Sequence, residues 1–168
     1  MKEVKLYNII FPIWLLIFFP PIIFITLAGN FVIDSLVILA CVSIFKLAIN
    51  SEERKSFYKN SIIKVWLFGF LADIIGAAIL FILGILGEYF GLSYELVSAI
   101  DFDPFSNPLA VMVIVFAMLV SALFIFLYNY KITFRELIKY NSVRFKVALT
   151  IAIVTMPWTF LLPTKWFY

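Results

Sequence analysis

A single carboxylate in an apolar stretch is the group in this chain most able to do chemistry. At helical spacing Asp73 shares one face with three small residues, Gly69, Ala72 and Gly76. A charge in hydrocarbon is costly, so we expect Asp73 to face protein or water rather than lipid. The small residues beside it allow a neighbouring helix to come close. The pattern predicts that residues 62–87 form the central span of a membrane bundle.

Lys46 is a candidate partner for Asp73. Counted from the expected water boundary, Lys46 lies about 8 Å deep on the preceding span, and Asp73 lies about 10 Å deep on its own. The similar depths on neighbouring antiparallel helices predict an ion pair inside the membrane. The alternative is that Lys46 extends along its aliphatic stem to the headgroups and pairs with nothing.

Two further polar residues, Asn30 and Asp34, follow the sequence Ala28-Gly29-Asn30. That sequence predicts a very short turn, with Asn30 as the N-cap of the next helix. Asp34 would then lie near water, close to the positive end of the helix dipole. A functional carboxylate inside the bundle is the alternative. If Asp34 lies near water, it is more than ~10 Å from Asp73 along the membrane normal, which argues against a dyad of aspartates that shares a proton.

The sequence lacks the residues that several kinds of catalytic and binding site require. Histidine is absent and Cys41 is the one cysteine, so we expect no His-dependent protease and no zinc site. No glycine loop has the strand and lysine that a phosphate cradle needs. We expect neither an enzyme nor a cofactor or metal centre. Asp101 and Asp103 form a weak candidate for a cation site, although solvated turn chemistry is the favoured interpretation.

Composition sets the environment of the fold. Mean hydropathy is +1.11, and hydrophobic residues make up 65% of the 168-residue chain against 14% charged residues. A soluble domain has about 25% charged residues, so we expect a bilayer as the solvent. The prediction is an all-α integral membrane protein, a single domain built as a bundle of five transmembrane helices. The expected spans are residues 8–28, 31–50, 62–87, 108–129 and 147–167.

Orientation follows from the basic residues. Lys and Arg lie before the first span, between the second and third, and after the fourth, whereas the segment 88–108 has neither. The positive-inside rule therefore predicts a cytoplasmic N-terminus and an outside C-terminus. The pair Pro20-Pro21 predicts that the first helix is kinked or broken, since proline removes an amide donor. A broken helix that lines a site is the alternative to a plain kink.

The fourth span has its own small residues, Ala117 and Ser121, which predict close packing against the third span. After it, residues 132–145 form a basic amphipathic stretch that is typical of a membrane surface or a docking segment. This stretch indicates contact with anionic lipid at the cytoplasmic face. The basic residues lie beside the spans, so we expect no nucleic-acid partner.

Two functions fit these features. The first is a small transport or channel component of the cell membrane, with a polar path near Asp73. The second is an accessory or assembly subunit without catalytic activity, which binds other membrane proteins, or a second copy of itself, through small-residue helix faces. Asp73 is costly to keep in a membrane without a use, so the first function is favoured.

Overall fold

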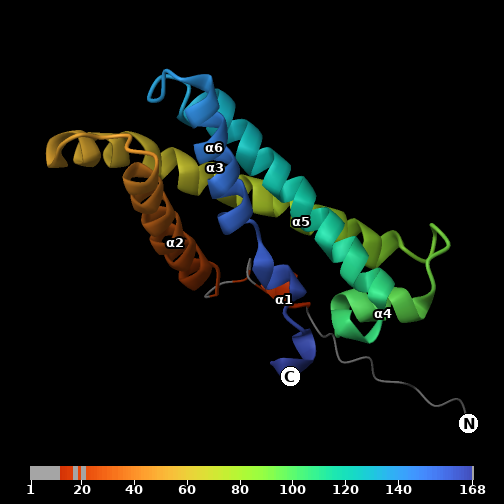
Figure 1. The fold of residues 1–168 in the computed structure, drawn as a ribbon. Helices are drawn as coiled ribbons and strands as arrows, with labels where there is room; N and C mark the ends of the chain where they lie inside the picture. The colour runs from red at the N-terminus through yellow and green to blue at the C-terminus, as the bar shows by residue number, and fades with distance from the viewer. Residues whose placement is uncertain (1–11, 17–18, 20–21, 168) are drawn as a thin grey trace, which may run out of the picture.

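The computed structural model describes residues 12–16, 19 and 22–167, and all its regular elements in these residues are helices (Figure 1). The longer helices are α2 (Ile22–Ile44), α3 (Ser51–Leu86), α4 (Tyr94–Asp101), α5 (Pro108–Tyr128) and α6 (Asn141–Thr155). The short ones are α1 (Ile13–Leu16), η1 (Pro104–Ser106), η2 (Asn129–Thr133), η3 (Trp158–Leu161) and η4 (Thr164–Trp166). Four segments are long and apolar enough to cross a membrane: 22–44, 51–86, 108–133 and 141–161. The chain is therefore a helical membrane protein by length and composition.

The four spans contact one another in a closed arrangement. α3 packs against α2 and α5, and α6 packs against the same two helices. In Figure 1, α5 lies along α3 while α6 lies between α2 and α5. The sequence predicted five spans, and the described residues contain four candidates. The predicted kink at Pro20-Pro21 and most of residues 8–21 lie outside the described part of the chain.

The predicted turn at residues 28–30 is wrong. α2 runs without interruption from Ile22 to Ile44, so Gly29 and Asn30 lie inside a helix. A methyl group added at Gly29 would meet nothing within 4 Å, so no packing contact requires glycine there. Asn30 is not an N-cap, and Asp34 lies at the middle of α2, where it is buried.

α3 begins where side chains satisfy its first amides. The Asn50 side chain accepts a hydrogen bond from the Glu53 amide at 2.8 Å, and the Glu53 carboxylate accepts one from the Ile49 amide at 2.8 Å. α3 therefore starts eleven residues before the predicted span, at Ser51. At 1.5 Å per residue it is about 54 Å long, so its polar first turns extend beyond a hydrocarbon layer of about 30 Å.

α3 and α5 approach most closely where both helices carry small residues. A methyl group added at Gly76 would lie 2.1 Å from Ser121 Oγ and 3.2 Å from the Ala117 carbonyl oxygen. Ala72, Ala117 and Ser121 are fully buried. The backbones approach this closely because no side chain separates them.

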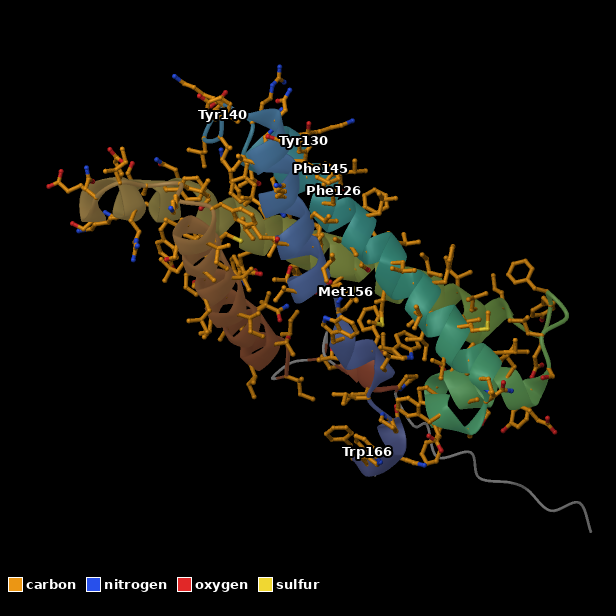
Figure 2. The ribbon with its side chains drawn as sticks, in the orientation of Figure 1. Phe126, Tyr130, Tyr140, Phe145, Met156 and Trp166 are labelled. Carbon is orange, nitrogen blue, oxygen red and sulfur yellow. The ribbon has the colours of Figure 1, made fainter. Side chains whose placement is uncertain are left out.

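The basic end of the bundle is held by aromatic contacts. Phe126 stacks on Tyr130, and Phe145 of α6 packs edge-on against both rings (Figure 2). The Arg144 guanidinium lies 4.7 Å from the centre of the Tyr130 ring. The predicted surface stretch 132–145 is only partly at a surface, because Phe134 is fully buried and stacks on Phe57 of α3.

α6 ends before it has crossed the bundle. Proline has no amide hydrogen, so Pro157 cannot donate to the Ile153 carbonyl, and α6 stops at Thr155. The Trp158 indole donates to that carbonyl instead, at 3.3 Å. The chain is extended at Met156, and the Trp158 amide donates to the Met156 carbonyl at 2.7 Å. The last candidate span is thus a broken helix.

Candidate functional site

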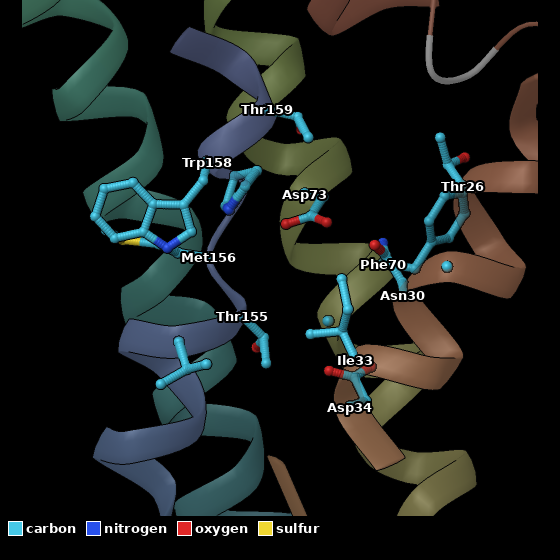
Figure 3. A pocket seen from close by; sticks show the side chains of 14 residues that line it. Thr26, Asn30, Ile33, Asp34, Phe70, Asp73, Thr155, Met156, Trp158 and Thr159 are labelled. Atoms are coloured by element: carbon cyan, nitrogen blue, oxygen red, sulfur yellow. The ribbon is translucent and has the colours of Figure 1, made fainter. Parts of the chain in front are cut away.

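A cavity of about 280 Å³ lies between α2, α3 and the break after α6 (Figure 3). Residues 26–34 of α2 and 69–73 of α3 form two of its sides. The third side is residues 154–159, which include the end of α6 and the start of η3. Figure 3 shows the carboxyl groups of Asp34 and Asp73 in the space between these three segments. Two carboxylates from two spans therefore line one cavity.

Both carboxylates are withdrawn from the surface. Asp34 is 4% exposed and Asp73 is 7% exposed. The two groups are close enough for their charges to interact, and the Oδ1 atom of Asp73 has no hydrogen-bond partner. Within residues 12–16, 19 and 22–167, no hydrogen bond joins the two carboxyl groups. The depth argument that separated them is wrong, because it depended on a turn at residues 28–30.

The two carboxylates lie at similar depths. By helical rise, Asp34 is about 18 Å from the start of α2 and about 15 Å from its end. Asp73 is about 20 Å from the end of α3 at Leu86. α2 and α3 run in opposite directions, so the start of α2 and the end of α3 lie at the same end of the bundle. The acidic segment 88–108 follows at that end. Both groups therefore lie well inside their helices, at similar distances from that end.

The end of α6 adds a negative pole to the cavity. The last four carbonyl groups of a helix have no partner inside it, and they carry the negative end of the helix dipole. Val154 and Thr155, the last two residues of α6, both line the cavity. The dipole favours a cation there, as unwound helices do in transporters that bind ions at mid-membrane.

No positive side chain balances these groups. Among the described residues that line the cavity there is no lysine or arginine. The predicted pair between Lys46 and Asp73 is wrong: Lys46 is exposed in the turn after α2, in a left-handed conformation with φ of 51°. Asp73 lies about 33 Å along α3 from Ser51, so the two residues are far apart.

The small residues of α3 divide between two neighbours. Gly69 lines the cavity, and a methyl group added there would lie 3.8 Å from Asp34 Oδ2. Gly76 instead faces α5 at Ala117 and Ser121. Asn30 also lines the cavity, from one turn before Asp34 on α2.

Asp101 and Asp103 lie outside the cavity, at the acidic end. Asp103 forms a salt bridge with Lys165 at 2.5 Å, so a side chain of this chain already neutralises it. Asp101 packs against α3, where its Oδ1 atom would lie 3.5 Å from a methyl group added at Gly84. Burial raises the pKa of the Asp101 carboxyl to about 6.

The sequence predicted a kink at Pro157 and a polar side of the last span that joins the bundle interior, but it did not predict what this side would meet. Thr155, Met156 and Trp158 were not predicted to face the aspartates. Pro157 was the available signal, because a proline in the last span breaks the helix and frees carbonyl groups. Sequence alone does not show which neighbour the freed groups would meet.

Comparison with known proteins does not indicate a function for this cavity. No protein-family model, no curated protein and no solved structure matches this chain.

Proposed function

We propose that this chain is a small transport or channel component of the cell membrane, through which cations pass by way of the cavity between α2, α3 and the end of α6. The observation that carries the proposal is that Asp34 and Asp73 are buried beside one cavity between candidate spans, without a basic residue in the lining. Two buried carboxylates without a positive partner are neutralised either by protons or by a bound cation. A site that can change its occupant is what transport requires.

The charge at the two ends of the bundle supports an orientation. The first turns of α3 and the α5–α6 connection carry clusters of Lys and Arg, and we assign that end to the cytoplasm, next to anionic lipid. The acidic end and η4 would then lie outside, where the exposed carboxylates Glu88 and Glu95 attract cations. The predicted cytoplasmic N-terminus concerns residues outside the described part of the chain.

The test is a flux assay in liposomes. Purified protein should carry protons or monovalent cations down an imposed gradient, measured with an internal pH dye or a radiolabelled ion. Asp73→Asn should lower the flux at least about tenfold, because it removes one of the two charges that draw a cation into the cavity. Asp34→Asn should act in the same direction.

Glu95→Gln is the matched control, since Glu95 is an exposed carboxylate on α4 away from the cavity. Its flux should equal that of the wild type. Absence of flux, together with crosslinking to a constant membrane partner, would replace this proposal with the accessory subunit.

A further inference from the structure

The size of the cavity limits what it can hold. Inorganic cations are held by oxygen ligands at about 2.0–2.6 Å, which need a cage close to the size of the ion. The cavity measures about 280 Å³, roughly twice the ~150 Å³ of a cavity that holds one benzene molecule. It is far larger than a cage for a bare ion and suits a small organic molecule.

The lining has the chemistry of an organic cation site. Most of the cavity wall is apolar, and it includes one aromatic side chain, Phe70 of α3, whereas the indole of Trp158 points away from the two aspartates (Figure 3). Aromatic rings attract ammonium groups through their negative faces. Across the described residues, no cluster of three or more His, Cys, Asp or Glu side chains could hold a metal ion. The described lining residues include two acidic side chains, Asp34 and Asp73.

We propose that the cavity binds a small organic cation, an ammonium group attached to an apolar or aromatic body. Asp34 and Asp73 neutralise the ammonium group, and the freed carbonyl groups at the end of α6 favour the same charge. Phe70 and Ile33 contact the body of the ligand. This inference rests on the proposed function, because it names the class of cation that the transport site takes.

Benzyltrimethylammonium is the probe, because it combines a permanent charge with a single aromatic ring. Its binding to purified protein in detergent is measured by isothermal titration calorimetry, beside sodium chloride and the neutral aromatic benzyl alcohol. We expect saturable binding of the quaternary ammonium alone. Asp73→Asn and Asp34→Asn should each weaken it at least about tenfold, whereas Glu95→Gln should leave it unchanged.

A second variant keeps both carboxylates and changes only the volume of the cavity. Gly29 lines the cavity, and a methyl group added there would meet nothing within 4 Å, so Gly29→Leu should fold, with its longer side chain taking up part of the volume. It should weaken benzyltrimethylammonium at least about tenfold, because the body of the ligand loses its space. Circular dichroism and gel filtration verify that each variant is folded.

The outcomes separate this inference from the proposed function. Flux of protons or sodium that Asp73→Asn abolishes, without binding of the quaternary ammonium, overturns the organic cation and leaves the transport proposal standing. Equal binding of benzyl alcohol, or unchanged binding in folded Gly29→Leu, also overturns it. Binding of benzyltrimethylammonium that both aspartate variants lose, without flux of any cation, supports the site and contradicts transport.

Discussion

Two glycines on α3, two turns apart on one face, meet opposite surroundings. Gly76 lies against α5, where an added methyl group would be 2.1 Å from Ser121 Oγ. Gly69 lies beside the cavity, where an added methyl group would be 3.8 Å from Asp34 Oδ2. The same residue type on the same helix thus closes an interface at one position and borders a cavity at the other.

The neighbouring helices explain the difference. α5 is continuous beside Gly76 and presents Ala117 and Ser121, so its backbone comes close. Beside Gly69 the nearest group is Asp34 of α2, and α6 ends at Thr155 on the other side of the cavity, so the space between them stays open. A small residue permits close packing, and the partner decides whether it occurs. The carboxylates lie on the side where the partner is interrupted.

Gly76→Ala is the largest expected effect. The new methyl group forces Ser121 Oγ to move and presses on the Ala117 carbonyl oxygen, which belongs to the backbone of α5. Overpacking of this kind costs about 1–3 kcal/mol. We expect a loss of stability of that size in chemical denaturation of the protein in detergent micelles.

The double variant Gly76→Ala with Ser121→Ala tests the cause. It removes the nearest clash, so it should recover part of the loss, and the two effects should not add. Simple additivity would mean that α3 and α5 do not approach at this point in the folded protein.

The close approach at Gly76 could be predicted from the sequence, and so could the burial of Asp73. Both follow from helical periodicity within one long apolar segment, where the face of each residue is fixed by its number. α5 was likewise predicted within a few residues, because Asn107 and Pro108 form a clear helix start: the Asn107 side chain accepts from the Leu109 amide at 2.9 Å.

The position of Asp34 could not be predicted in the same way. Residues 8–50 are apolar almost throughout, so any window of about 20 residues within them is long enough to span a bilayer. The predicted boundary between the first two spans then depended on Gly29 and Asn30. Membrane helices tolerate glycine in their interiors, so Gly29 did not mark a helix end. The pair Pro20-Pro21, which precedes the start of α2 at Ile22, was the better boundary signal. The wrong boundary moved Asp34 to a helix end and separated it from Asp73.

A third glycine of α3, Gly84, lies in the last turn of the helix, beside the acidic end. Gly84 faces Asp101, a partly buried residue at the acidic end, and this burial raises the pKa of its carboxyl to about 6. Between about pH 4 and pH 6 the folded protein holds this proton while the unfolded chain has released it. The contribution of Asp101 to stability therefore falls as pH rises through that range and stays constant above it.

Asp101→Asn should remove this dependence. At pH 7 we expect the variant to be more stable than the wild type by on the order of 1–3 kcal/mol, and at pH 4 we expect the difference to disappear. Unfolding in denaturant at the two pH values measures it, with the exposed Glu95→Gln as the control that shows no such change. An equal difference at both pH values would show that packing, and not ionisation, sets the effect.

Gly69→Ala is the smallest expected effect and the direct counterpart of Gly76→Ala. The added methyl group makes an ordinary contact with Asp34 Oδ2, and alanine favours a helix over glycine by up to about 1 kcal/mol. We therefore expect stability equal to or slightly above that of the wild type in the same denaturation assay. A loss as large as that of Gly76→Ala would mean that α2 closes on α3 as tightly as α5 does. Asp34 and Asp73 would then face packed helices rather than a cavity, and no cation could reach them.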